Sequence, residues 1–405
     1  MSGGAAPRVR IGVAGLGRAF AFMAPTFRAD SRVALVAAAD PRAAARDRFA
    51  AEFGGRAYVT VDEMVRDPGI DAVYVATPHQ FHAAHVALAA GARRHVLVEK
   101  PMALSISDGR AMVDACAAAG VHLVVGHSHG FDAPIREARR VVDRGEVGRV
   151  RMITALNFTD FLYRLRRPEE LDTAAGGGAV FNQAAHHVDV VRRLAGARAL
   201  SVRAEVGRWD DARPTEGAYS ALIRFEGGAF ATLVYSGYAH FDSDAWCGWV
   251  GEMGQARDPD DYGAARRRLA AVRSRGEEAA LKAASNYGAS AAPVPPAAPA
   301  MHQHFGPLIV SCDRADLRPH STGVEIYGDA ERRTIDLAPP AVPRVEVIDE
   351  LVGAVVHGRR PLHDGVSALA TVEILLAMLR SASEGRDVAL EHQVAFPSEP
   401  AQEAS

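Results

Sequence analysis

Lys100 is the residue whose type and position most clearly indicate proton chemistry in this chain. It follows the apolar run His95–Val98 and Glu99, and Pro101 comes next and stiffens the turn. Of 46 basic residues only two are lysines, Lys100 and Lys282. Because arginine stays charged whereas a partly buried lysine can exchange a proton, a lysine at this strand end indicates a role that arginine cannot fill. A surface lysine left by chance is the alternative.

A second group of reactive side chains lies on a predicted helix over residues 179–194. Asn182, His186 and Asp189 stand at i, i+4 and i+7, so a regular helix would place them on one face. A histidine titrates near neutral pH and can accept a proton from a substrate hydroxyl. An amide can orient that hydroxyl but cannot take its proton. The alternative is a helix histidine that a neighbour satisfies, and His187, on another face, fits that structural description better.

The N-terminal residues predict a dinucleotide-binding turn. The apolar strand Val9–Ala14 runs into Gly15-Leu16-Gly17-Arg18-Ala19-Phe20, ahead of a helix. Two glycines at this spacing let the backbone turn tightly and approach a pyrophosphate at the helix N-terminus. Phe20 stands where a third glycine normally permits close packing of helix on strand, so we expect this helix to sit differently.

The next strand, Val33–Ala39, ends in Asp40, 23 residues after Gly17. The dinucleotide fingerprint has an acid about 20 residues on, which binds the ribose hydroxyls. Asp40 therefore predicts NAD, since a carboxylate repels the 2′-phosphate of NADP. Arg42 is close enough to weaken that preference, so NADP is not excluded. Asp40 can also cap the following helix ahead of Pro41.

Strands alternate with helices through residues 1–127, which predicts a doubly wound parallel sheet. Residues 128–390 then predict a separate α+β domain. Its expected strands are 151–157, 199–206, 218–225, 229–235, 322–327 and 332–337, and its expected helices are 345–357 and 365–384. An insertion at about 245–306 is expected to be helical over 261–285 and irregular over the proline-rich 291–300, and is either a cover over the substrate or a surface excursion. A loose tail, 391–405, ends the chain.

Composition excludes several classes of protein. A net charge of −3 over 405 residues gives no general attraction to nucleic acid or anionic membrane. No apolar run reaches the ~18–20 residues of a membrane span, and the N-terminus has no signal core. Three cysteines without Cys-x-x-Cys spacing predict free thiols in a reducing cytoplasm. We expect a small-molecule substrate as the partner.

Two His-x-His pairs raise the possibility of a metal. They are His127 with His129 and His302 with His304, and such pairs can contribute metal ligands. No cysteine or acid cluster accompanies them, so we expect no metal and interpret these histidines as substrate contacts or packing.

The motifs resemble those of the Gfo/Idh/MocA oxidoreductases over nearly the whole chain. The residues that carry the resemblance are Gly15-Leu16-Gly17, Ala76-Thr77-Pro78 with His82, Glu99-Lys100-Pro101, and Gly176-Gly177-Gly178 with His186. The resemblance implies an NAD(P)-dependent dehydrogenase with a Rossmann domain, a second domain with a large open, mostly antiparallel sheet, and a homodimer or homotetramer. It also implies an acid at position 182 and a catalytic histidine at 186. Here the acid is the amide Asn182, so proton transfer would rest on His186 and Lys100.

A narrower resemblance points to phthalate 4,5-dihydrodiol dehydrogenases, which oxidise a cis-dihydrodiol to the aromatic diol. It is carried by residues 77–82, Gly126-His127-Ser128-His129 and Asn157-Phe158-Thr159-Asp160-Phe161. The alternatives are a sugar or cyclitol dehydrogenase of the same family and a non-catalytic NAD-binding regulator. Retention of Lys100 and His186 disfavours the regulator.

These arguments yield three sets of predicted site residues. The catalytic set is Lys100, His186 and Asn182. The cofactor set is Gly15, Gly17, Arg18, Ala19, Asp40, Arg42, Thr77, Pro78, His79, His82, Glu99 and Lys100. The substrate set is His127, His129, Asn157, Phe158, Arg164 and Phe181. Arg166 and Arg167 join Arg164 as candidate forks for a substrate carboxylate, although a solvated arginine is the default for each.

Overall fold

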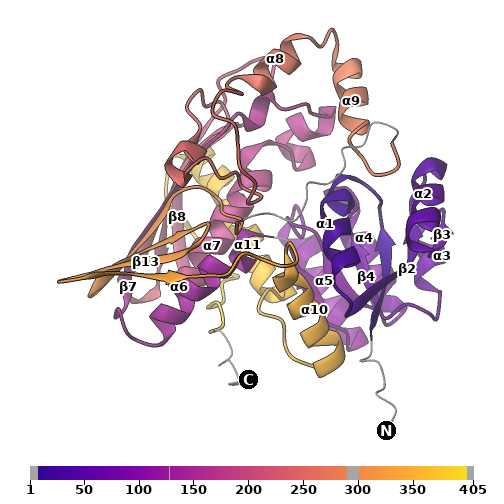
Figure 1. Cartoon of the computed structure of the whole chain (residues 1–405), viewed down its shortest axis with the longest axis horizontal. Coiled ribbons are helices and arrows are strands. Elements are labelled where there is room, and N and C mark those ends of the chain that lie inside the picture. The colour runs from indigo at the N-terminus through magenta and orange to yellow at the C-terminus, as the bar shows by residue number, and fades with distance from the viewer. Residues whose placement is uncertain (1–7, 127, 290–300, 399–405) are drawn as a thin grey trace. The chain divides into compact units, whose positions relative to one another are not determined.

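The computed structural model of the chain describes residues 8–126, 128–289 and 301–398 (Figure 1). The chain divides into two compact units. The first unit draws on Met1–His127, Ala279–Ala298 and Ala341–Leu369, and the second unit on Ser128–Glu278, Pro299–Pro340 and Ala370–Ser405. The first unit thus includes more than residues 1–127. Part of the insertion and the segment 341–369 also belong to it.

The first unit contains the predicted parallel sheet, with six strands in the order β3-β2-β1-β4-β5-β6. The strands are β1 (Val9–Ala14), β2 (Val33–Ala39), β3 (Arg56–Tyr58), β4 (Ala72–Val75), β5 (His95–Val98) and β6 (Leu123–Val125). Strand order reverses between β1 and β4, so the crevice outside their carboxyl ends is where such a sheet binds its ligand. Gly15, Thr77 and Lys100 follow β1, β4 and β5 at that edge.

Helices connect these strands as the alternation predicts. They are α1 (Arg18–Ala29), α2 (Ala43–Phe53), α3 (Val61–Val65), α4 (His82–Gly91) and α5 (Ile106–Ala119), with α10 (Val345–His357) in the same unit. The start of α5 shows why the chain folds this way locally. Ser105 accepts a hydrogen bond from the backbone N–H of Asp108 at 3.1 Å and so caps the helix.

Phe20, which replaces the third glycine, is fully buried in an aromatic cluster. Its ring lies 6.2 Å from that of Phe49, 6.1 Å from Phe53 and 4.9 Å from Tyr287, centroid to centroid. Helix α1 therefore packs through a large side chain where other dinucleotide-binding helices use a glycine. Tyr287 belongs to the insertion, so residues 279–289 of the insertion pack against α1 and α2 of the first unit.

The second unit contains a nine-stranded sheet in the order β14-β13-β12-β11-β7-β10-β9-β8-β15. Its strands are β7 (Val150–Phe158), β8 (Ala199–Gly207), β9 (Ala218–Phe225), β10 (Phe230–Ser236), β11 (Leu308–Cys312), β12 (Ala315–His320), β13 (Gly323–Gly328), β14 (Arg332–Asp336) and β15 (Val388–Ala389). The pairing is antiparallel except between β7 and β10, which confirms a mostly antiparallel sheet. Strands β3, β11, β12 and β15 were not predicted.

Two expected helices differ from the structure. The segment predicted as one helix over 179–194 begins with a π-helical turn, Val180–Ala184, before α7 (Ala185–Ala195). The predicted helical stretch 261–285 is two short helices, α8 (Ala264–Ala270) and α9 (Arg275–Ala283). The proline-rich part of the insertion, 290–300, and the last residues of the tail, 399–405, lie outside the described residues.

The remaining helices are α6 (Ala133–Asp143) and α11 (Gly365–Glu384). By length and composition α11 could cross a membrane, contrary to the expectation that no apolar run is long enough. However, 61% of its most apolar window is buried inside the protein. We therefore interpret α11 as a core helix.

Candidate active site

Lys100 lies in a turn that buried His82 ties to the neighbouring strand. The His82 ring is fully buried, with Nε2 2.9 Å from the carbonyl oxygen of Thr77. Its Nδ1 lies 3.2 Å from the carbonyl oxygens of both Pro101 and Met102. Burial lowers the pKa of His82, whereas its contacts with these carbonyl oxygens act in the opposite direction. His82 therefore links the turn after β4 to the turn that carries Lys100.

Glu99, next to Lys100, is half-buried and accepts a hydrogen bond from the hydroxyl of Tyr74. Burial raises the pKa of the Glu99 carboxyl, although Tyr74, Arg344 and Lys100 act in the opposite direction. The peptide bond between Lys100 and Pro101 is cis.

The turn after β1 has the shape that a dinucleotide requires. Gly15 has φ 91°, and an added Cβ would lie 2.9 Å from Cγ2 of Thr77 and 3.1 Å from the carbonyl oxygen of Ala76. Helix α1 begins after Gly17, and no side chain caps its first N–H groups. Those N–H groups and the helix dipole favour a phosphate. The residues present thus fit NAD.

Asp40 is buried and bridges Leu16 to Arg42. Its Oδ2 accepts from the N–H of Leu16 at 2.8 Å and from Nη2 of Arg42 at 2.9 Å, and its Oδ1 accepts from Arg42 Nε at 2.9 Å. Arg42 also donates to the carbonyl oxygens of Leu16 and Tyr287. The half-exposed Arg42 side chain therefore covers the carboxylate that we predicted to bind the ribose.

The other predicted cofactor residues lie along the same edge of the first unit. Thr77 Oγ1 lies 3.0 Å from His85 Nδ1, and the His79 ring contacts His82 edge to face at 5.5 Å. The Arg18 guanidinium lies 5.1 Å from the centre of the Phe22 ring. Ala19 and Pro78 are half-buried.

In the second unit, three imidazoles gather around Phe305. The centre of the Phe305 ring lies 5.1 Å from that of His129, 4.8 Å from His186 and 4.7 Å from His187. The His129 and His186 rings meet edge to face at 4.7 Å. The structure thus brings together one predicted catalytic residue and one predicted substrate residue.

The three imidazoles differ in their polar partners. His129 Nδ1 lies 2.6 Å from Oδ2 of Asp132, and both side chains are buried. His187 Nδ1 lies 2.8 Å from the hydroxyl of Tyr219, and burial lowers the pKa of His187 to about 3. His187 is therefore a neutral, structural residue, in line with its position on a different face from His186.

Asn182 holds the glycine-rich loop that precedes its helix. Its Nδ2 donates to the carbonyl oxygens of Gly176 at 3.1 Å and Gly178 at 2.8 Å. Gly178 has φ 81°, and an added Cβ would lie within 2.5 Å of the Glu216 carboxyl. Because a carboxylate cannot donate hydrogen bonds, an aspartate could not replace the Asn182 contacts.

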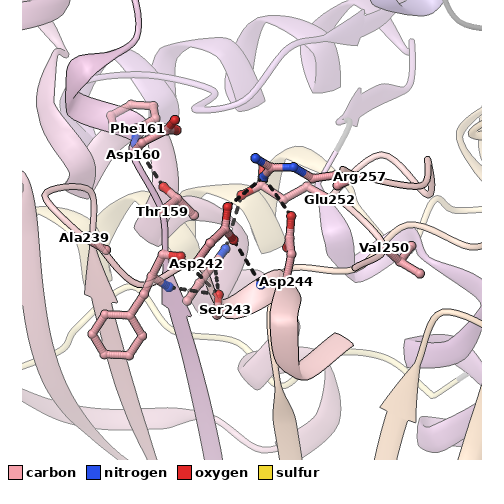
Figure 2. A network of polar contacts seen from close by, with 12 residues as sticks. Thr159, Asp160, Phe161, Ala239, Asp242, Ser243, Asp244, Val250, Glu252 and Arg257 are labelled. Carbon is pink, nitrogen blue, oxygen red and sulfur yellow. Dashed lines mark hydrogen bonds and ion pairs between the residues drawn. The ribbon is translucent and has the colours of Figure 1, made fainter. Parts of the chain in front are cut away.

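Asn157, at the end of β7, is fully buried in a polar network. Its Oδ1 accepts from Ser243 Oγ at 2.8 Å, and its Nδ2 donates to Oε1 of Glu252 at 3.2 Å. Figure 2 shows Ser243 and Glu252 near Arg257, whose Nη1 lies 2.9 Å from carboxylate oxygens of both Asp242 and Asp244. These contacts fix the loop after β10 against β7.

The predicted arginine forks have different environments. Arg166 is buried, donates to the carbonyl oxygen of Phe161 and lies 3.7 Å over its ring, so it is structural. Arg167 pairs with Glu169 and Glu170. Arg164 donates to Asp160 at 2.9 Å and keeps 38% of its side chain exposed.

The other predicted substrate residues are only partly accessible. Phe158 is half-buried and donates its N–H to Ser243 Oγ, and Phe181 is buried. His127 lies outside the described residues. His302 and His304 bind the backbone carbonyl oxygens of Ala338 and Val250. Within the described parts of the chain, no three His, Cys, Asp or Glu residues group as a metal site would require.

Sequence reasoning missed Asp132 and Phe305. A cavity beside the imidazoles is lined by His129, His187, His304, Phe305, Leu308 and His320, among other residues. Asp132 stands three residues after His129, a spacing that would have suggested the pair. Nothing local marks Phe305, which lies far along the chain from α7.

Family profiles, related sequences and solved structures all match this chain to oxidoreductases. The profile of an oxidoreductase family with an NAD-binding Rossmann fold matches residues 9–127, and that of a GFO/IDH/MocA C-terminal domain matches residues 135–257. A 1-carboxy-3-chloro-3,4-dihydroxycyclohexa-1,5-diene dehydrogenase of Comamonas testosteroni is 47% identical over 92% of this chain and 94% of its own. A dehydrogenase-like protein from Bordetella bronchiseptica has a solved structure with a TM-score of 0.89, 41% identity, and coverage of 95% of this chain and 100% of that one. Myo-inositol 2-dehydrogenase of Thermotoga maritima is 27% identical over 58% of this chain and 71% of its own.

Proposed function

The chain belongs to the Gfo/Idh/MocA oxidoreductase family and is an NAD-dependent dehydrogenase, and we propose that its substrate is the cis-dihydrodiol of an aromatic carboxylate. The product would be the corresponding aromatic diol. The observation that carries this proposal is the 47% identity, over nearly the full length of both chains, to a dehydrogenase of a carboxylated dihydroxycyclohexadiene.

The second unit offers surroundings that suit such a substrate. A dihydrodiol ring is flat and largely apolar, so it favours aromatic walls over the many polar groups that a sugar requires. Phe305 and the rings around it provide such walls. Arg164, with an exposed part of its guanidinium-bearing side chain, is our candidate for the substrate carboxylate.

The proposed reaction removes one hydride and one proton. When bound, NAD⁺ supplies the hydride acceptor. The C–H bond of the reacting carbinol breaks with its electron pair, the O–H bond releases a proton, and a C=O bond forms. The resulting ketone then tautomerises to the aromatic diol. In this proposal His186 accepts the hydroxyl proton, and Lys100 donates a hydrogen bond to the same oxygen.

The turn that His82 ties together would keep the Lys100 ammonium in a fixed position. A nearby positive charge from the oxidised nicotinamide would favour the neutral form of Lys100 and help it share the proton. Gly15, Gly17 and the first turn of α1 would hold the pyrophosphate.

A substrate panel tests this function. Purified enzyme with NAD⁺ would be offered a monocarboxylated cis-dihydrodiol, the phthalate 4,5-dihydrodiol, a cis-dihydrodiol without a carboxyl group, and myo-inositol. We expect NADH formation, with one aromatic diol per NADH, for a carboxylated dihydrodiol, and much lower kcat/KM without the carboxyl group. Turnover of myo-inositol alone would refute the proposal in favour of a cyclitol dehydrogenase. NAD binding without turnover of any substrate would favour a regulator.

An Arg164→Gln variant sharpens the panel. If Arg164 binds the carboxylate, its loss should raise KM for carboxylated dihydrodiols about tenfold or more, and leave KM for the uncarboxylated one unchanged. Arg167→Gln is the matched control, because Arg167 is nearby and almost equally exposed but contacts two carboxylates, Glu169 and Glu170, where Arg164 contacts Asp160. Equal effects of both variants would remove Arg164 from the site.

We also propose a homodimer or homotetramer assembled through the outer face of the nine-stranded sheet. Met152, Phe230 and Ile309, on the neighbouring strands β7, β10 and β11, are exposed in the single chain. An apolar stripe of this kind favours burial against a second copy. Light scattering should give a dimer or tetramer, and Phe230→Glu should yield a smaller species. A wild-type monomer at micromolar concentration would contradict the proposal.

A further inference from the structure

A histidine that accepts a proton needs a partner that fixes its tautomer and stabilises the positive charge it gains. Two polar side chains on the same helix also make contacts of their own. Asn182 uses its amide to hold Gly176 and Gly178, and Asp189 accepts a hydrogen bond from the hydroxyl of Ser128. A further source of compensation for that charge lies on another element.

The pair His129–Asp132 lies directly beside His186. Asp132 Oδ2 lies 2.6 Å from His129 Nδ1, and the side chains of both are about 5% exposed. Asp132 precedes α6, yet its carboxylate makes no capping bond to that helix and is directed to His129 instead. A buried carboxylate at this distance holds the proton on Nδ1 and leaves Nε2 on the opposite side of the ring as the basic atom.

The His129 ring, which Asp132 orients, is in direct contact with the ring of His186. His129 and His186 meet edge to face at 4.7 Å, and Phe305 packs against both and limits their movement. The third imidazole, His187, is neutral and bound to Tyr219. His129, by contrast, contacts a buried carboxylate, that of Asp132.

We propose that Asp132 and His129 are positioning residues for the proton acceptor of the reaction. Asp132 fixes the Nδ1–H tautomer of His129, and the pair stabilises the positive charge that His186 gains when it takes the hydroxyl proton. The hydride leaves to NAD⁺, the proton resides on His186 beside the Asp132–His129 pair, and it is released to solvent after the product. The proposal rests on the proposed dehydrogenase function.

Asp132→Asn is the decisive variant, because it removes the charge and keeps the shape. The new amide would donate to Nδ1 and force the opposite tautomer of His129. We expect kcat to fall by about 10²–10⁴-fold, as for a misoriented acid–base group, with little change in KM. The acidic limb of the pH profile of kcat/KM should move to lower pH. Loss of the nearby negative charge of Asp132 makes protonated His186 less favourable and so lowers its pKa. Asp132→Glu, which keeps the charge, should recover part of kcat.

Other groups near this pair also affect the profile. Among the described residues, the charged and titratable groups around His129 include Asp132, His186 and His187, and the charge of Asp132 also acts on His302. His302→Asn therefore serves as a second pH control, and its profile should keep the wild-type acidic limb within error. A shift as large as that of Asp132→Asn would assign the effect to His302 and overturn the proposal.

Imidazole ¹⁵N NMR of the NAD complex tests the arrangement without turnover. Wild type should show His129 as the Nδ1–H tautomer, and Asp132→Asn should show Nε2–H. Glu350→Gln is the matched control, since it makes the same carboxylate-to-amide change at the contact between Glu350 and His363 Nδ1 in the first unit and should leave kcat unchanged.

The outcomes separate this proposal from the proposed function. The variants are measured with whichever substrate of the panel the wild-type enzyme oxidises. If wild type oxidises only a polyol, the dihydrodiol function is refuted, but the variants still test the role of Asp132 and His129. A folded Asp132→Asn with wild-type kcat would overturn the positioning role. An Nε2–H tautomer of His129 in wild type would overturn it independently of any substrate.

Discussion

Replacing Asn182 with aspartate should destabilise the second unit, although the two side chains have nearly the same shape. The Asn182 amide donates hydrogen bonds of 3.1 Å and 2.8 Å to the carbonyl oxygens of Gly176 and Gly178. Both glycines are buried. Loss of two such bonds in Asn182→Ala costs about 2 kcal/mol of unfolding free energy, at about 1 kcal/mol each. An aspartate adds repulsion between its carboxylate and both oxygens, so we expect about 3 kcal/mol or more.

Tryptophan fluorescence during urea unfolding measures this effect in the right part of the chain. All three tryptophans, Trp209, Trp246 and Trp249, belong to the second unit, which also contains Asn182. The order of unfolding free energies should be wild type, then Asn182→Ala, then Asn182→Asp. Gln183→Glu is the matched control, because it makes the same chemical change on the adjacent residue.

Activity gives a second readout of the same variant. If the amide holds the glycine loop, Asn182→Asp should have a lower kcat than wild type. An Asn182→Asp protein as stable as wild type, with equal or higher kcat, would refute the argument. It would mean that position 182 faces the proton path and tolerates an acid there.

Three further predictions follow from single side chains. Lys100→Arg should lower kcat by about 10²–10⁴-fold while NAD binding, followed by fluorescence titration, survives, and near-normal kcat would mean that Lys100 acts only as a charge. Arg42→Ala should uncover the Asp40 carboxylate and lower the NADP to NAD ratio of kcat/KM by about tenfold, whereas an unchanged ratio would place Arg42 away from the ribose. Burial raises the pKa of Glu325, but its hydrogen bonds to arginines and a tyrosine outweigh this and lower the pKa from 4.5 to about 2. Because the pKa is lower in the folded state, ionised Glu325 stabilises that state above pH 4.5, and this stabilisation is lost as pH falls toward 2. In Glu325→Gln the unfolding free energy, measured by urea unfolding, should therefore fall less steeply over this pH range. The same pH dependence as in wild type would contradict the prediction.

Several elements could be predicted because their signals are local. Strands β1, β2 and β9 and helices α10 and α11 match the predicted bounds, since apolar residues at strand or helix spacing report which face is buried. The Gly-x-Gly turn was predictable for the same reason. Its glycines serve a backbone geometry that no other residue adopts cheaply, as the φ of 91° at Gly15 shows.

Other elements escaped because their signal is weak or not local. Strand β12 contains Pro319 and two charged residues, and β15 is two residues long, so neither shows an apolar pattern. The π-helical turn at Val180–Ala184 replaces a stretch that local periodicity describes equally well as α-helix. Asn182 turns back to Gly176 and Gly178 there, a contact that helical spacing does not predict.

By itself the sequence determined the class of chemistry: a dinucleotide turn, a lysine at a strand end and a histidine on a later helix identify a nicotinamide-dependent dehydrogenase. Only the tertiary structure decided which polar group each of these side chains meets. It covered Asp40 with Arg42, placed Tyr287 of the insertion against Phe20, and set the His129–Asp132 pair beside His186. The physical reason is that a buried polar or aromatic group must find a partner wherever folding brings one, and that partner is often far away in the chain.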